Sequence, residues 1–207
     1  MKALLICGSP HERGCTYTAL EEVEKALNKN GIETEIFQIG KKPISGCVAC
    51  TACYKTHRCA IEDSVNEIAD RLEEFDAIII GSPVYYASAN STLTAFLDRL
   101  FYSAGRKMAG KVGACIVSCR RGGATAAYDQ LNKYFGISNM VVATSQYWNQ
   151  IHGNTREEAL QDAEGLQTMR SLGENVAWLL RLIECGKQNG IEPPKYDEKR
   201  ERTNFIR

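Results

Sequence analysis

The sequence has no excess of charge of either sign. Its 207 residues include 25 lysines and arginines and 25 aspartates and glutamates, so the formal net charge at pH 7 is zero. Proteins that bind polyanions usually carry a clear positive excess, so the balance argues against nucleic acid and against an acidic membrane surface as partners. We therefore expect chemistry on small molecules.

Long hydrophobic runs are also absent. The apolar run after Met1 is too short for the core of a signal peptide, and no later run is long enough to span a membrane. We expect a cytoplasmic protein that has no membrane partner. In that reducing compartment the nine cysteines should mostly be thiols, which favours metal or redox use where they cluster.

Internal repeats and low-complexity segments are missing as well, so nothing divides the chain into several units. A length of 207 residues suits a single domain with a tail. We expect one domain over residues 1–189, which includes a cysteine loop at residues 47–59, and a C-terminal tail over residues 190–207.

Short aliphatic runs predict strands that are buried on both faces of a parallel sheet. Four such runs occur, at residues 2–7, 76–80, 112–118 and 140–144. An alternating pattern at residues 34–39 fits a fifth strand at a sheet edge. Apolar stripes with helical spacing lie between the strands, residues 155–188 form a closing helical pattern, and Ser64 with Glu67 reads as a capping box. This alternation predicts right-handed βαβ units in a three-layer α/β fold, with function in the loops at the carboxyl ends of the strands.

The loop after the first strand has the composition of a phosphate site. From Gly8 to Thr18 it is rich in hydroxyl groups and leads into a helix, whose free N–H groups and dipole attract a phosphate. The loop lacks the Gly-Lys-Ser/Thr of a Walker A motif and the Gly-x-Gly-x-x-Gly of a dinucleotide turn. The remaining interpretation is a metal-free phosphate cradle suited to a mononucleotide.

Several motifs occur in an order that resembles the flavodoxin-like family of NADPH-dependent FMN reductases. They are Gly8-Ser9-Pro10, Gly14-x-Thr16, Gly81-Ser82-Pro83-Val84-Tyr85-Tyr86, and then Leu93, Phe96, Leu97, Asp98 and Arg99. The likeness runs from the first strand through Asn149. It implies a flavodoxin-like αβα sandwich around a five-stranded parallel sheet in the order 2-1-3-4-5, with FMN at the switch point between the first and third strands.

The resemblance assigns the FMN contacts to three loops. Their residues are Ser9, Arg13, Cys15 and Thr16 at the phosphate, Pro83, Val84, Tyr85 and Tyr86 along the isoalloxazine edge, and Cys119, Arg120, Arg121 and Gly122 in the third flavin loop. A cation from Arg120 or Arg121 near the flavin would favour its anionic reduced form. The flavin supplies the reactivity, so no side chain is assigned a catalytic role.

Four cysteines lie close together in the stretch from Cys47 to Cys59. Cys47, Cys50 and Cys53 have the spacing with which one loop wraps a corner of a [4Fe–4S] cluster, and Cys59 would complete the ligand set. The motif resembles that of the iron-sulfur flavoproteins, a branch of the same family. A loop of reduced thiols, a zinc site and a disulfide are the alternatives.

The resemblance implies an FMN-dependent oxidoreductase in which NAD(P)H reduces the flavin and a quinone, nitroaromatic, flavin or similar small acceptor takes the electrons. One alternative is an iron-sulfur flavoprotein that carries electrons from ferredoxin. Another is a non-catalytic module that binds FMN or senses redox state. By analogy with relatives we also expect a homodimer or homotetramer.

Overall fold

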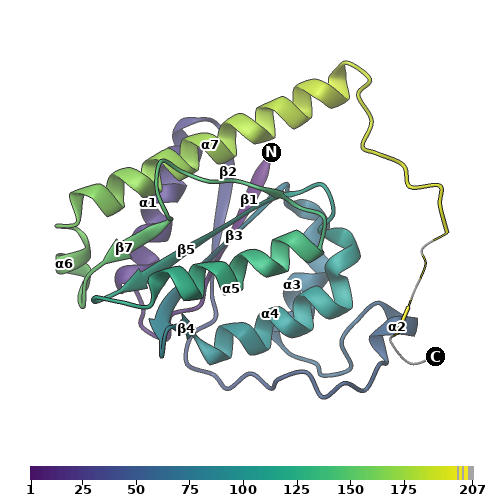
Figure 1. Cartoon of the computed structure of the whole chain (residues 1–207), viewed down its shortest axis with the longest axis horizontal. Helices are drawn as coiled ribbons and strands as arrows, with labels where there is room; N and C mark the ends of the chain where they lie inside the picture. The colour runs from purple at the N-terminus through teal and green to yellow at the C-terminus, as the bar shows by residue number, and fades with distance from the viewer. Residues whose placement is uncertain (200, 202, 205–207) are drawn as a thin grey trace.

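The computed structural model describes residues 1–199, 201 and 203–204, and places one sheet between two layers of helices (Figure 1). The strands are β1 (Lys2–Cys7), β2 (Glu33–Gln38), β3 (Ala77–Tyr85), β4 (Ser88–Ala89), β5 (Val112–Cys119), β6 (Val141–Val142) and β7 (Gln150–His152). The main path through the sheet is β2-β1-β3-β5-β6, and all of its pairings are parallel. β1, β3 and β5 have apolar side chains on both faces, as central strands between two helical layers require.

The flavodoxin-like fold and the order of its main strands are confirmed, but the predicted count of five strands is wrong. β4 is a short addition that pairs antiparallel with the end of β3. The predicted strand at residues 140–144 is only the two-residue β6, and β7 continues the same edge of β5 further along. Between β6 and β7 the buried Asn149 pairs with β5. Its side-chain amide donates to the Cys115 carbonyl at 2.9 Å, and its backbone carbonyl accepts the N–H of Val117 at 2.9 Å.

The helices cover the two faces of the sheet unequally. α1 (Cys15–Lys29) and α7 (Ala163–Gln188) share one face, and a Cβ at Gly173 would lie 2.5 Å from the Ala26 Cβ, so the two helices pack in close contact. α3 (Ser64–Arg71), α4 (Ser91–Ala104) and α5 (Ala124–Ile137) cover the other face. The shorter elements are α2 (Cys53–Thr56), η1 (Leu72–Glu74), η2 (Gly105–Lys107) and α6 (Arg156–Ala159).

Two helix boundaries differ from the prediction because an aspartate caps each helix. Asp63, not Ser64, is the N-cap of α3, and its carboxylate accepts the Val65 backbone N–H. Asp162 caps α7 by accepting from Gly165, so the helical pattern at residues 155–188 divides into α6 and α7. A carboxylate at this position satisfies an N–H group that the helix itself leaves free.

The chain after α7 has no regular structure over residues 191–199. Within the predicted tail, residues 200, 202 and 205–207 lie outside the described residues. In the part of the chain that is described, no helix combines the length and the apolar character needed to cross a bilayer.

Candidate functional site

The loop between β1 and α1 leaves the first turn of α1 open to a ligand. Gly14 is the N-cap, no side chain caps the helix, and its first turn holds no acidic residue. The buried Ser9 hydroxyl accepts the backbone N–H of His11 at 3.2 Å. Arg13, the residue just before the N-cap, is exposed and has a φ of 50°. Free N–H groups at the positive end of a helix suit an anion such as a phosphate.

Cys15 and Thr16 anchor this first turn to neighbouring elements. The Thr16 hydroxyl lies 2.7 Å from the hydroxyl of Ser118 on β5, in the buried interior. The Cys15 thiol donates to the Thr155 carbonyl at 3.2 Å, and burial raises its pKa, so this sulfur is a protonated thiol. Contact of these two residues with FMN stays a prediction.

Pro83, Val84 and Tyr85 belong to β3, so the predicted second loop is in fact a hairpin that joins β3 to β4. Its two-residue turn consists of Tyr86 and Ala87, with φ values of 50° and 56°. Such turns usually carry glycine or asparagine, so two ordinary side chains here hold the backbone under strain, and strain of this kind clusters at ligand sites. The turn leaves the Tyr86 side chain fully exposed at the edge of the sheet.

The third loop follows β5 and packs against this hairpin. Burial raises the pKa of the Cys119 thiol, whereas Arg120, Arg121 and Gly122 are exposed. Gly123 has a φ of 88°, and a Cβ there would lie 2.8 Å from the Ala87 Cα. The glycine therefore allows the third loop to approach the backbone of the hairpin closely.

The structure thus brings the three predicted FMN loops to one edge of the sheet. The Gly8 N–H donates to the Gly81 carbonyl at 2.8 Å, which joins the first loop to β3, and the Thr16–Ser118 contact joins it to β5. Arg13, Arg120 and Arg121 add exposed positive charge at this edge. Free N–H groups, cations and an exposed aromatic hairpin fit the phosphate and ring of FMN.

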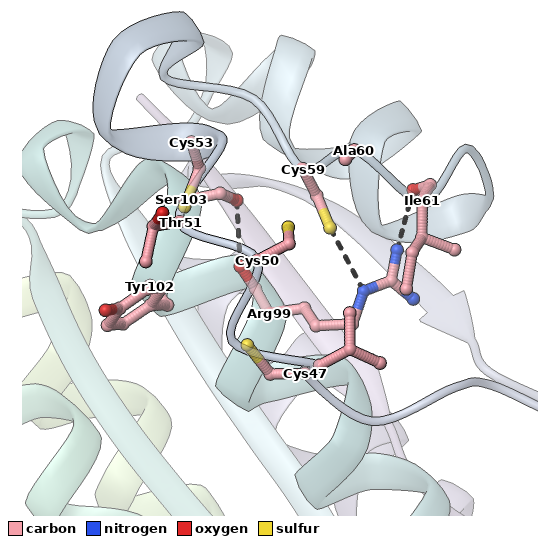
Figure 2. A pocket seen from close by; sticks show the side chains of 11 residues that line it. Cys47, Cys50, Thr51, Cys53, Cys59, Ala60, Ile61, Arg99, Tyr102 and Ser103 are labelled. Atoms are coloured by element: carbon pink, nitrogen blue, oxygen red, sulfur yellow. Dashed lines mark hydrogen bonds between the residues drawn. The ribbon is translucent and has the colours of Figure 1, made fainter.

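A second candidate site lies in the loop between β2 and α3, where the four clustered cysteines line one hollow (Figure 2). Arg99 and Tyr102 of α4 also line it. One residue in each interval between successive cysteines has a left-handed backbone: Ala49, Thr51 and His57, with φ values of 52°, 59° and 55°. These reversals turn the chain so that the thiols face the same hollow.

All nine cysteines lie in the described part of the chain, and none of them is paired in a disulfide in this structure. Among residues 1–199, 201 and 203–204, no group of three or more His, Cys, Asp or Glu side chains converges closely enough to hold one metal ion. A zinc ion requires such tetrahedral convergence, whereas each thiolate of a four-iron cluster binds a different iron. Thiols spread around a hollow therefore fit a cluster better than a single zinc ion.

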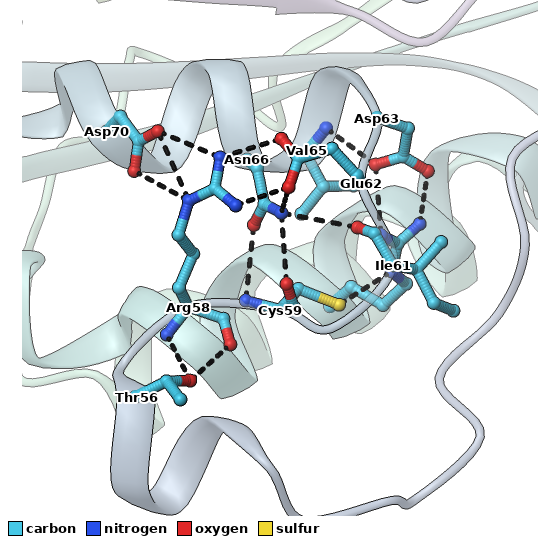
Figure 3. A network of polar contacts seen from close by, with 10 residues as sticks. Thr56, Arg58, Cys59, Ile61, Glu62, Asp63, Val65, Asn66 and Asp70 are labelled. Carbon is cyan, nitrogen blue, oxygen red and sulfur yellow. Dashed lines mark hydrogen bonds and ion pairs between the residues drawn. The ribbon is translucent and has the colours of Figure 1, made fainter.

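Two buried polar residues to which the sequence assigned no role hold Cys59, and Figure 3 shows one of them, Asn66. Asn66 of α3 accepts the Cys59 N–H at 3.2 Å and donates to the Cys59 carbonyl at 3.0 Å. Arg99 of α4 donates from Nε to the Cys59 sulfur at 3.2 Å (Figure 2). The sequence named Arg99 only as part of a family motif. Its place within the buried apolar face of α4 is the signal that it needs a buried partner, because a charged side chain is almost never fully buried unless it is paired.

Tyr102 of α4 lines this hollow, and it pairs with Tyr54 of α2. Their rings lie 5.5 Å apart between centroids, and their hydroxyls form a hydrogen bond with each other. That hydrogen bond raises the pKa of Tyr102 to about 12, so its hydroxyl remains neutral at physiological pH. The pair joins α2 to α4 beside Cys53.

The two candidate sites lie at different places along α4. At its start Asn90 caps the helix and donates its backbone N–H to the Ser82 hydroxyl at 2.9 Å, next to the hairpin. Arg99 lies eight residues beyond Ser91, which at a rise of about 1.5 Å per residue is about 12 Å along the axis. In Figure 1 the hairpin strand β4 and the helix α2 accordingly lie toward opposite ends of α4.

Comparisons with known proteins identify the family of this chain. The sequence model of the NADPH-dependent FMN reductase family matches residues 1–155. An iron-sulfur flavoprotein of Methanocaldococcus jannaschii is 33% identical over 191 residues, which cover 88% of this chain and 99% of that protein.

Two solved structures bear on the fold alone, because their sequence identity to this chain is low. The crystal structure of RosB with a bound 8-demethyl-8-formylriboflavin-5'-phosphate intermediate has a TM-score of 0.70 at 16% identity, covering 100% of this chain and 92% of that one. NAD(P)H:quinone oxidoreductase from Methanothermobacter marburgensis has a TM-score of 0.64 at 15% identity, and the match covers 85% of this chain and 96% of that one.

Proposed function

This chain belongs to the NADPH-dependent FMN reductase family and is a flavin-dependent oxidoreductase, and from that premise we propose that it combines FMN with a [4Fe–4S] cluster. In this proposal electrons pass from NAD(P)H through the flavin to a small acceptor such as a quinone or nitroaromatic compound. The observation that carries the proposal is that four free cysteines line one hollow in a domain that also has an open phosphate cradle.

The chain's own residues would bind and orient the flavin. The open first turn of α1, with Ser9 and Arg13, would hold the phosphate, and the hairpin with Tyr85 and Tyr86 would lie along the ring edge. Arg120 or Arg121 would place positive charge near the ring, where it stabilises negative charge. FMN, when bound, supplies the hydride chemistry, so these residues act by position and electrostatics.

Cys47, Cys50, Cys53 and Cys59 would hold the cluster. Their spacing, their common hollow and the similarity to the Methanocaldococcus jannaschii iron-sulfur flavoprotein support this assignment. The test is the iron and acid-labile sulfide content of anaerobically purified protein. We expect the Cys50→Ser variant to lose iron and the Cys185→Ser variant, which changes an exposed cysteine on α7, to retain it. Equal iron in both variants would remove the cluster assignment.

A second candidate function is an electron carrier that takes electrons from ferredoxin, and the cysteine hollow with the name of that relative favours it. Stopped-flow reduction of the FMN-loaded protein, with NADPH or reduced ferredoxin as the electron donor, distinguishes the reductase from the carrier. NADPH oxidation with quinone, nitroaromatic or ferric acceptors supports the reductase, whereas rapid reduction by ferredoxin and none by NADPH supports the carrier. If the protein binds flavin but turns over with neither donor, the third hypothesis, a non-catalytic FMN-binding or redox-sensing module, would be supported instead.

We also propose that the protein forms a homodimer or homotetramer. Large apolar side chains are exposed on α7, at Trp178 and Leu182, and after β6, at Tyr147 and Trp148. Exposed aromatic residues of this kind are enriched in subunit interfaces. Sedimentation velocity at micromolar concentration tests the proposal, and a monomer would contradict it.

A further inference from the structure

Arg99 is buried to an unusual degree for a charged residue, with 1% of its surface exposed. Its guanidinium pairs with both carboxylate oxygens of Asp63, at 2.5 and 2.9 Å. A charge removed from water is costly unless it is paired and hydrogen-bonded, and a two-point pair with a carboxylate is a strong form of such compensation. Asp63 is partly exposed, so the ion pair extends from the interior toward the surface.

The remaining contacts of Arg99 join the two ends of the cysteine loop. Nη1 donates to the Ser45 carbonyl at 3.3 Å, just before Cys47. Nη2 donates to the Ile61 carbonyl at 2.7 Å, just after Cys59. One side chain of α4 therefore holds the segments that enter and leave the cysteine loop.

The contact from Arg99 Nε to the Cys59 sulfur, at 3.2 Å, adds an electrostatic effect to this structural one. In the described part of the chain, Cys59 is the member of the four that accepts a hydrogen bond from a cation, while Cys47 and Cys50 are exposed. Hydrogen bonds to cluster sulfurs and the charge around them set the reduction potential of iron-sulfur centres. A buried cation acts more strongly than an exposed one because water screens it less.

We infer that Arg99 is a positioning residue that raises the reduction potential of the cluster through its N–H···S bond to Cys59, and that the Asp63 carboxylate moderates this effect. The inference rests on the proposed function, because it requires a cluster in the hollow. Positive charge beside a ligand sulfur stabilises the reduced cluster, which is more negative. Negative charge from Asp63, on the far side of the same guanidinium, offsets part of that stabilisation.

The two members of the pair therefore predict opposite shifts. Arg99→Met removes the charge and the hydrogen bond and should lower the midpoint potential. Asp63→Asn leaves Arg99 uncompensated and should raise it. Asparagine is as good an N-cap as aspartate, so this variant keeps the start of α3. Arg106→Met, which removes an exposed arginine just after α4, is the matched control and should leave the potential unchanged.

The experiment is an anaerobic redox titration monitored by electron paramagnetic resonance, with iron and labile sulfide measured on each sample. For Arg99→Met we expect about a tenfold fall in the ratio of reduced to oxidised cluster at a fixed potential, which is about 59 mV for a one-electron couple. If Arg99→Met retains too little iron to titrate, Asp63→Asn decides, and a rise supports the inference.

An unchanged potential in Asp63→Asn, or in an iron-containing Arg99→Met, would overturn the role of Arg99 while leaving the proposed function intact. Wild-type protein without iron would instead overturn the cluster assignment and this inference with it. Lower iron content in the variants at an unchanged potential would show that Arg99 only holds the loop together, which also overturns the inference.

Discussion

Asn66 shows how much a single buried amide contributes to the cysteine loop. It is fully buried in α3, and both ends of its amide are engaged, with the N–H and the carbonyl of Cys59 and with the Ile61 carbonyl. The loop backbone is otherwise irregular at this point, so no neighbouring strand or helix would replace these partners. Asn66 therefore supplies the hydrogen bonds that regular structure supplies elsewhere.

We predict that Asn66→Ala lowers the free energy of unfolding of the metal-free protein by about 1–3 kcal/mol, because it leaves backbone polar groups without partners. Urea denaturation measures this change. Asn132→Ala on α5 is the matched control, because the buried Asn132 Oδ1 has no partner among the described residues and its Nδ2 makes one hydrogen bond, at 3.1 Å, to the Tyr128 carbonyl within the same helix. That control should cost little, since alanine is the better helix former. Equal losses in the two variants would contradict the role given to Asn66.

At the scale of elements, the hairpin and the third flavin loop depend on one backbone contact. Gly123 has a left-handed conformation, and a Cβ at this position would lie 2.8 Å from the Ala87 Cα. A Cβ at Gly122 would meet nothing within 4 Å. We predict that Gly123→Ala costs at least about 1–2 kcal/mol from its backbone conformation alone. Gly122→Ala should change the free energy of unfolding by less than about 0.5 kcal/mol. Thermal or urea denaturation of the flavin-free variants tests this, and similar stabilities would show that the contact is not required.

Elements differ in how well the sequence predicts them. β1 is predicted to the residue, because an unbroken apolar run between two helical layers has one stable arrangement. The predicted strand at residues 140–144 is reduced to β6, and the pairing with β5 resumes only at β7, because the Asn149 side chain takes the place of a backbone partner of β5. Such a substitution follows from tertiary packing and leaves no periodic pattern in the sequence. The turn at Tyr86 and Ala87 lacks the glycine that would have marked it.

The candidate site divides in the same way. The grouping of Cys47, Cys50 and Cys53 follows from local spacing, and the structure brings them to one hollow together with Cys59. The role of Arg99 depends instead on where α4 passes the loop, because Arg99 lies 40 residues along the chain from Cys59, whereas Asn66 is only seven residues away. Residues that act through such distant contacts are found only once the fold is known.

At the scale of the whole molecule, the flavin loops and the cysteine hollow are separate. Asn90 and Ser82 mark one end of α4, and Arg99 lies about 12 Å further along the helix axis, by its rise per residue. We predict that Cys50→Ser, which should lose the cluster, retains FMN at the wild-type ratio of flavin to chain. The absorbance of the flavin released on denaturation, divided by the protein concentration, measures that ratio. A parallel loss of flavin would mean that the two sites form one unit.

The cysteine loop lies outside the domain's buried core. None of residues 40–62 is buried, and Ile44 is the apolar side chain of this segment that packs against the core cluster. The loop is thus a module docked on the rest of the domain, and Arg99, Asn66 and Tyr102 are among the residues that hold it there. A loop docked in this way can change its sequence or its occupant without rebuilding the core, provided that the two helices keep the contacts that hold it.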